Sequence, residues 1–190
     1  MKLLKEKIIK EGRITGEEIL KVDSFLNHQI DPSLLNEIGK EFLKRFSNEK
    51  VTKILTIEAS GIAIAAIAGL HFNVPIVFAK KVESKNLDKE TYKTQVYSFT
   101  KGKNYDIQVS KRYLNSEDHI LILDDFLANG RASIGLIELV KQANATLAGV
   151  GIVIEKGFQE GGEILRNNNV NLQSLAIVNK FKNGEITFKN

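Results

Sequence analysis

The chain has 190 residues and a mass of 21.2 kDa, and its 43% hydrophobic and 26% charged residues are typical of one globular domain. It contains no cysteine, which excludes disulfide bonds, thiolate metal sites and a cysteine nucleophile and is consistent with a reducing cytoplasm. The longest apolar run covers residues 62–68, whereas a membrane-spanning helix needs about 20 apolar residues. The N-terminal segment MKLLKEKIIKEG carries charges throughout, so we predict neither a signal peptide nor a membrane partner.

The net charge is +4 at pH 7, and positive charge is concentrated between Lys80 and Tyr113. This segment has nine lysine and arginine residues against four acidic residues, and it contains all four tyrosines of the chain. A local basic surplus attracts an anion such as nucleic acid, a phosphorylated metabolite or an acidic surface. A solvated lysine-rich loop would have the same composition, so the charge alone leaves both interpretations open.

The first 50 residues predict two helices. Residues 2–11 combine leucine and isoleucine with mixed charge, which is typical of a short amphipathic helix. Asp31 and Pro32 open a second helix, because aspartate caps free N–H groups and proline suits the first helical position. An apolar stripe follows in that helix at Leu35, Ile38, Phe42 and Phe46. Between the two helices, residues 19–30 show neither a helical nor a strand period.

From residue 51 onward, short apolar runs alternate with helical patterns, which predicts an α/β fold with a mostly parallel sheet and helices on both faces. A hairpin of residues 95–99 and 106–110 interrupts the alternation, and Asn183-Gly184 predicts a second hairpin turn. Ligands of such sheets bind at the carboxyl ends of the strands. The expected strands are 54–57, 74–79, 119–123, 147–154 and 172–178, and the expected helices among them are 62–70, 132–143 and 163–166.

The segment Ile120–Ser133, ILILDDFLANGRAS, carries the strongest functional signal. Its apolar strand ends in two carboxylates, and a loop of small residues then leads into a helix. Such a loop and the helix N-terminus suit a phosphate, whereas the carboxylates suit sugar hydroxyls or a hydrated metal ion. A chance Asp-Asp turn or a Walker B strand is the structural alternative. The Walker interpretation fails because the chain has no G-x-x-x-x-G-K-[ST] motif, and it has no G-x-G-x-x-G motif either.

This segment resembles the phosphoribosyl-pyrophosphate (PRPP) signature of the type I phosphoribosyltransferases. The usual signature ends in Thr-Gly-Gly, whereas Asn129-Gly130-Arg131-Ala132 is similar to the bacterial xanthine phosphoribosyltransferase branch of that family. Four further blocks resemble that branch in the same order, and together they extend the resemblance over nearly the whole chain. They are LKVDSFLNHQID (20–31), VTKILTIEASGIA (51–63), VYSFTK (96–101) and GIVIEKGF (151–158).

The resemblance implies a type I phosphoribosyltransferase fold in a single domain, residues 1–190. In it, residues 1–30 and the C-terminal residues form a small hood, and the inserted hairpin belongs to a flexible lid. The implied reaction is purine salvage, in which xanthine and PRPP give xanthosine 5′-monophosphate and pyrophosphate. Mg²⁺ would arrive with PRPP, without a dedicated protein site. The implied assembly is a homodimer in the cytoplasm.

The resemblance also assigns roles to individual residues. Asp124 and Asp125 are expected to meet the ribose hydroxyls as catalytic residues. The base is expected to contact Leu20, Asn27 and Lys156, with Phe158 stacking on its ring. Two sets should hold the phosphates: Ala128, Asn129, Gly130, Arg131 and Ala132 for the 5-phosphate, and Glu58, Ala59, Ser60 and Lys81 for the pyrophosphate.

Other functions are compatible with the same fold. The chain could transfer phosphoribose to adenine, hypoxanthine, guanine or orotate, or it could be a PRPP-sensing regulator that binds nucleic acid. We expect nucleic acid not to be a partner, because 190 residues leave no room for an added winged helix. The segment Lys81–Ser110 is predicted to be a lid that orders on PRPP binding. The chain departs from common family residues at Ile64, at Gly157 and at Glu160-Gly161-Gly162.

Overall fold

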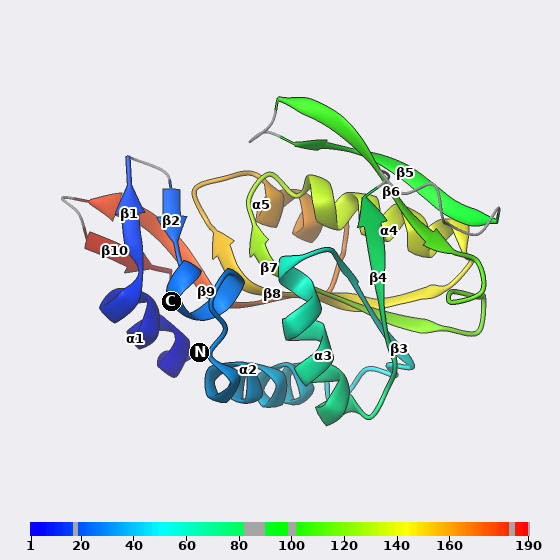
Figure 1. Ribbon diagram of the computed structural model, residues 1–190, viewed down its shortest axis with the longest axis horizontal. Helices are drawn as coiled ribbons and strands as arrows, with labels where there is room; N and C mark the ends of the chain where they lie inside the picture. Colours follow the sequence, from blue (N-terminus) through cyan, green and yellow to red (C-terminus); the bar gives the residue numbers. More distant parts are fainter. Residues whose placement is uncertain (17–18, 82–89, 99–101, 183–184, 190) are drawn as a thin grey trace.

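The computed structural model describes residues 1–16, 19–81, 90–98, 102–182 and 185–189, and its centre is an eight-stranded sheet (Figure 1). The sheet order is β10-β9-β8-β7-β3-β4-β6-β5. Strands β4, β3, β7, β8 and β9 are parallel, and β10, β6 and β5 add antiparallel edges, so the predicted mostly parallel sheet is confirmed. The strands are β3 (Lys53–Ile57), β4 (Ile76–Lys81), β5 (Thr91–Ser98), β6 (Lys103–Ser110), β7 (His119–Leu127), β8 (Thr146–Lys156), β9 (Leu172–Lys182) and β10 (Glu185–Phe188).

Helices cover both faces of the sheet. Helices α2 (Pro32–Arg45) and α3 (Ser60–Phe72) lie on one face, and α4 (Arg131–Gln142) and α5 (Gly161–Asn167) lie on the other (Figure 1). Successive residues of the central strands therefore enter different apolar clusters: Ile54 and Leu121 pack on the α2–α3 side, whereas Leu55 and Ile122 pack on the α4–α5 side. This double burial explains why these strands read as continuous apolar runs.

The two predicted N-terminal helices are confirmed. Helix α1 (Lys2–Glu11) buries Leu4 and Ile8 and packs against β9 and β10. In α2 the Asp31 carboxylate accepts a hydrogen bond from the Leu34 N–H at 3.1 Å, as expected of a cap ahead of Pro32. The segment 19–30 without a clear period forms β2 (Ile19–Lys21), which pairs with β1 (Arg13–Thr15), and then a single π-helical turn, η1 (Asp23–Asn27).

Several predicted strand ends were wrong, and two of these errors have a clear physical cause. Strand β4 begins at Ile76 because Pro75 has no N–H to donate and the Val74 N–H closes the end of α3 by donating to the Gly69 carbonyl. Strand β7 continues to Leu127 because its pairing with β8 continues past the acids. The two acids therefore lie within the strand and not in a turn after it.

The predicted hairpin is confirmed by β5 and β6, which belong to the main sheet. Strand β6 pairs with the edge of β4 at Lys80 and Lys81. Val96, Ile107 and Val109 are buried, and Gly135 of α4 lies against the first two: a Cβ there would lie 2.6 Å from a Val96 methyl group. These parts of the predicted lid are thus packed into the core. Its residues 82–89 and 99–101 lie outside the described residues, as does the predicted turn at Asn183-Gly184.

Strands β9 and β10 pair antiparallel on either side of that turn, as a hairpin requires. Within the residues that the structure describes, no helix is long and apolar enough to cross a membrane.

Candidate active site

The carboxyl ends of β3, β4, β7 and β8 lie at one edge of the sheet and place most of the predicted site residues together. A cavity of about 320 Å³ opens at the ends of β7 and β8. The loop after β7 and the end of β8 line one part of it, and the β5–β6 hairpin lines another. The lining residues are Val96, Tyr97, Tyr105, Phe126, Leu127, Ala128, Asn129, Gly130, Arg131, Ala132, Ser133, Lys156 and Gln159.

The two adjacent acids of β7, Asp124 and Asp125, repel each other electrostatically. Asp124 is buried with 5% of its surface exposed, and its Oδ1 accepts a hydrogen bond from the Asp125 N–H at 2.9 Å. Burial first, and then the neighbouring Asp125 carboxylate, raise the pKa of Asp124 well above its usual range, while the positive charge of Lys81 opposes that shift. A carboxyl group in this state favours hydroxyl partners or an added positive charge, which are what a sugar and its metal-bound diphosphate provide.

The loop from Ala128 to Ala132 leads into an uncapped helix. Gly130 adopts a left-handed conformation with φ of 79° immediately before α4, and no side chain among the described residues caps this helix. The first N–H groups of α4 have no partner within the helix and carry partial positive charge. Arg131 adds a full charge at the same point. This end of α4 is therefore a ready anion site beside the acids.

The turn between β3 and α3 brings the predicted pyrophosphate residues together. Glu58 binds β4 twice: its N–H donates to the Ala79 carbonyl at 3.1 Å, and its Oε1 accepts from the Lys81 N–H at 2.5 Å. The Glu58–Ala59 peptide bond is cis, and Ser60 begins α3. The Lys81 ammonium lies 5.3 Å from the centroid of the Tyr105 ring. The turn and Lys81 are therefore adjacent, and the charge of Lys81 is close enough to the acids to act on the pKa of Asp124.

Sequence reasoning missed three polar groups of this region. The Thr56 hydroxyl is buried and has no hydrogen-bond partner among the described residues; a Cβ at Gly61 would lie 1.9 Å from it and 3.3 Å from Asp124 Oδ1. The Gln159 side-chain oxygen is likewise buried without such a partner. Burial, and then the charge of Asp124, raise the pKa of Tyr105. Only Thr56, a polar residue inside the apolar run ILTI, left a sequence signal.

The structure brings two of the four predicted base-binding residues to the acids or the cavity. Asn27, at the end of η1, donates its side-chain amide to Asp125 Oδ2 at 3.1 Å. Lys156 lines the cavity. Phe158 follows β8 and is 36% exposed, outside the cavity lining. Leu20 is only 6% exposed, and its side chain packs in the apolar cluster that includes Leu4 and Ile8.

A dedicated metal centre is absent from the described part of the chain, where no three acidic or histidine side chains gather. Asp124 and Asp125 can offer a pair of carboxylates. This donor set fits Mg²⁺, which proteins often bind through one or two carboxylates together with substrate phosphates.

Comparisons with known proteins decide the family. A family model for the "Phosphoribosyl transferase domain" matches residues 23–178. The chain belongs to the phosphoribosyltransferase family. Its members include a xanthine phosphoribosyltransferase of Clostridioides difficile (strain 630), which is 63% identical over 190 residues and 100% of both chains. A xanthine phosphoribosyltransferase of Clostridium novyi (strain NT) is 60% identical over the same span, again covering 100% of both chains.

A solved phosphoribosyltransferase has the same fold. The adenine phosphoribosyltransferase of Rhodothermus marinus superposes with a TM-score of 0.75 at 20% identity, covering 92% of this chain and 98% of that one. The predicted family and the predicted type I phosphoribosyltransferase fold are therefore confirmed.

Proposed function

We propose that the chain transfers phosphoribose from PRPP to xanthine in purine salvage, giving xanthosine 5′-monophosphate and pyrophosphate. The observation that carries this proposal is the cavity in which the uncapped start of α4 and Lys156 meet, lined also by Phe126, which directly follows the two acids in β7. The start of α4 suits the 5-phosphate, the acids of β7 suit the ribose hydroxyls, and Lys156 suits an oxygen of the base. The full-length relatives named xanthine phosphoribosyltransferase support the choice of base.

The PRPP half of the site follows from charge. The 5-phosphate binds to the N–H groups of residues 128–132 at the start of α4. The ribose hydroxyls donate to Asp124 and Asp125, which are next to that loop but accept rather than donate. The pyrophosphate lies over the β3–α3 turn, where Ser60 and Lys81 provide donors. The phosphate sites therefore avoid the carboxylates, and the sugar spans the distance between them.

The reaction breaks the bond between the anomeric carbon and the pyrophosphate oxygen and forms a bond to a ring nitrogen of the base, whose proton is released to the pyrophosphate or to water. Positive charge develops on the ribose, where the two carboxylates stabilise it. Lys81 neutralises charge on the leaving group. Mg²⁺ bound with PRPP would add to this neutralisation. The packed hairpin and the hood exclude water and hold the base in line with the anomeric carbon.

The base half of the site uses donors. Xanthine has oxygens at C2 and C6, and the Lys156 ammonium and the Asn27 amide can each donate to one of them. Hypoxanthine lacks the 2-oxo group, so it would leave a donor without a partner. A buried unsatisfied donor costs about 1–3 kcal/mol, which corresponds to a preference of roughly tenfold to hundredfold.

We further propose a homodimer and a cytoplasmic location, as the family resemblance implies. Sedimentation of the purified chain tests the first, because a monomer would contradict it. Fractionation of cells tests the second, because recovery outside the cytoplasmic fraction would contradict it.

A turnover assay tests the main proposal. The chain is incubated with PRPP and Mg²⁺ and with xanthine, hypoxanthine, guanine, adenine or orotate, and nucleotide and pyrophosphate are measured. We expect xanthosine monophosphate to form fastest, and Lys156→Ala to reduce the preference for xanthine over hypoxanthine at least tenfold. Lys180→Ala, an exposed lysine on the neighbouring strand β9, is the matched control. Preferred turnover of another base would disprove the base assignment. PRPP binding without turnover, joined to salt-dependent nucleic-acid binding, would instead support a regulator.

A further inference from the structure

Helix α5 lies directly against the loop of residues 128–132, which is called the phosphate loop below because the 5-phosphate is proposed to bind there. The Gly161 N–H donates to the Ala128 carbonyl at 3.0 Å. A Cβ at Gly161 would lie 2.3 Å from the Ala128 oxygen and 2.5 Å from the Gly130 nitrogen. Such distances are too short for any side chain. Glycine at position 161 therefore allows the backbone at the start of α5 to pack against the backbone of the loop. The backbone of α5 thus fixes the backbone that binds phosphate.

The other side of α5 is attached to β8 by an ion pair between the buried Glu155 and the partly exposed Arg166. The two guanidinium nitrogens of Arg166 donate to the two oxygens of Glu155 at 2.8 and 2.7 Å, and Glu155 is only 3% exposed. The Ser174 hydroxyl of β9 donates to the same carboxylate. Burial alone would raise the pKa of Glu155, but the hydrogen bonds from Arg166 and Ser174 outweigh it and lower the pKa. The carboxylate is therefore held in its charged form.

Gly162 makes this ion pair possible. A Cβ at Gly162 would lie 2.1 Å from Glu155 Oε1 and 2.5 Å from an Arg166 nitrogen. The two consecutive glycines thus serve two different contacts, one with the phosphate loop and one with the ion pair. Glu155 directly precedes Lys156, which lines the cavity. Helix α5 consequently connects the phosphate loop to the residue next to the base lysine.

We propose that the Glu155–Arg166 ion pair, acting through α5 and its two glycines, positions the phosphate loop and Lys156 relative to each other. Glu155 and Arg166 are positioning residues in this arrangement, since neither lines the cavity. The assignment of the two ligands, phosphate and base, rests on the proposed function. A misplacement of about 1 Å between two bound reactants can cost about a hundredfold in rate, so the ion pair influences turnover without touching a substrate.

Variants of Arg166 test this proposal. Arg166→Met removes the ion pair, Arg166→Lys keeps the charge but loses the fork of two parallel bonds, and Glu155→Gln with Arg166→Met removes both charges together. We expect Arg166→Met to raise KM for PRPP and for xanthine about tenfold each, with partial rescue in Arg166→Lys. The double variant keeps the test valid if Arg166→Met alone fails to fold, because it leaves no buried unpaired charge.

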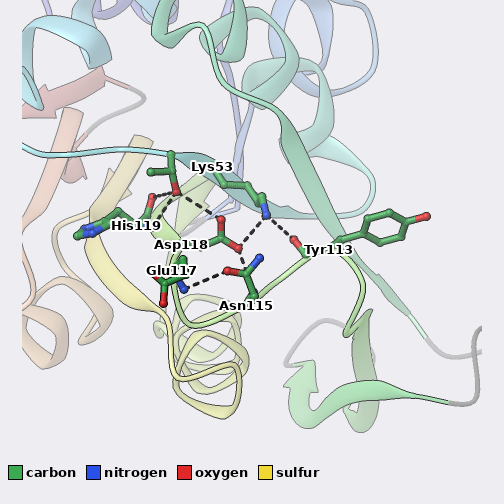
Figure 2. Close-up of polar contacts among 7 residues, drawn as sticks. Lys53, Tyr113, Asn115, Glu117, Asp118 and His119 are labelled. Atoms are coloured by element: carbon green, nitrogen blue, oxygen red, sulfur yellow. Dashed lines mark hydrogen bonds and ion pairs between the residues drawn. The ribbon is translucent and has the colours of Figure 1, made fainter.

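The matched control is Lys53→Met, which removes the cation from another buried carboxylate, Asp118, at the opposite edge of the sheet (Figure 2). All variants are assayed well below their melting temperatures, so that unfolded chains do not contribute. We expect the control to melt earlier with both KM values unchanged. Equal KM and kcat values in the wild type, Arg166→Met and the double variant would overturn the proposal and leave the ion pair a stabilising role alone.

Binding of ribose 5-phosphate, measured by calorimetry, separates this proposal from the proposed function. This probe carries the phosphate and the sugar but no base, and it needs no turnover. We expect Gly161→Ala and Arg166→Met to weaken its binding about tenfold, and Lys53→Met to leave it unchanged. Unchanged binding in Gly161→Ala and Arg166→Met would reject the positioning role. A wild-type chain that binds the probe but does not turn over xanthine would reject only the proposed function.

Discussion

Two buried aspartates at opposite edges of the sheet have opposite surroundings. Asp118, just before β7, accepts hydrogen bonds from the Lys53 ammonium at 2.8 Å and from the Asn115 N–H at 2.9 Å (Figure 2). The same ammonium donates to the Tyr113 carbonyl at 2.8 Å. Asp124, at the other end of β7, faces a second carboxylate instead. Both are almost fully buried, with exposed fractions of 8% and 5%.

The different surroundings of Asp118 and Asp124 indicate that the first contributes to stability, whereas the second suits the binding of a ligand. At the amino edge the fold supplies every partner that Asp118 needs, so the charge stabilises the structure. At the carboxyl edge the fold does not offset the burial of Asp124 or its repulsion from Asp125, an environment typical of binding groups, which agrees with the role proposed above. Proteins tolerate such destabilising arrangements where a ligand completes them. The following predictions test this contrast.

The largest effect is expected for Asp124→Asn. The amide keeps the shape of the carboxyl group but cannot stabilise positive charge on the ribose, so we expect kcat/KM to fall roughly a thousandfold. The melting temperature at pH 7 should stay the same or rise, because a repulsive buried charge is removed. Steady-state kinetics and calorimetry on the same sample measure both quantities. A variant that retains more than a tenth of the activity would show that the Asp124 charge does not take part in the reaction.

The opposite result is expected for Lys53→Met. Removing one partner of a buried ion pair leaves an uncompensated charge and destabilises a protein by about 3–5 kcal/mol. We expect urea unfolding to show a loss of this size, with kcat per folded molecule unchanged. Adding Asp118→Asn to the same chain should restore much of the lost stability. No restoration would mean that Lys53 acts through its stem and not through its charge.

The pH dependence of stability distinguishes the same two regions. Asp124 has a raised pKa, so the folded chain binds its proton more tightly than the unfolded chain does. Its contribution to stability is therefore complete below the ordinary carboxyl pKa and is lost as pH rises through the raised pKa. We expect the gain in stability of Asp124→Asn over the wild type to grow across that pH range. A gain that is constant between pH 4 and pH 8 would contradict the raised pKa.

The smallest effect concerns two threonines at either end of β3. Thr52 Oγ1 accepts a hydrogen bond from the His119 N–H at 2.8 Å, whereas the buried Thr56 hydroxyl has no partner among the described residues. Replacing each by valine keeps its shape. We expect Thr52→Val to destabilise the chain by about 1 kcal/mol and Thr56→Val to be neutral or slightly stabilising. A larger loss of stability for Thr56→Val would show that its hydroxyl is hydrogen-bonded in solution.

The sequence predicted the sheet and the phosphate loop well because both depend on local patterns. An apolar run, two acids and a small-residue loop are adjacent along the chain. One continuous segment therefore predicts a strand, a loop and the start of the next helix. The extension of β7 to Leu127 was not predictable from that segment, because it depends on backbone pairing with β8. The strand and the following helix were predicted, and the point at which the strand ends was not.

Contacts between distant segments could not be predicted from the sequence, because they too depend on how segments far apart in the chain pack together. Asn27 and Asp125 are 98 positions apart, and only the folded chain shows that one donates to the other. The role of Tyr105 depends on where the hairpin packs, and the roles of Gly161 and Gly162 depend on the groups that approach them. Small residues and exposed polar residues carry little periodic signal, so their contribution to a site becomes visible only in three dimensions.

The attachment of the first helix to the last strands affects how the chain matures during synthesis. The Met1 amino group donates to the Leu175 carbonyl, and Leu4 and Ile8 belong to the same apolar cluster as Leu175 and Val178. A ribosome releases the start of a chain long before its end, and early domains usually fold first. Here α1 must keep two apolar side chains available until β9 has emerged from the ribosome. A segment that is translated late therefore completes the folding of one that is translated early.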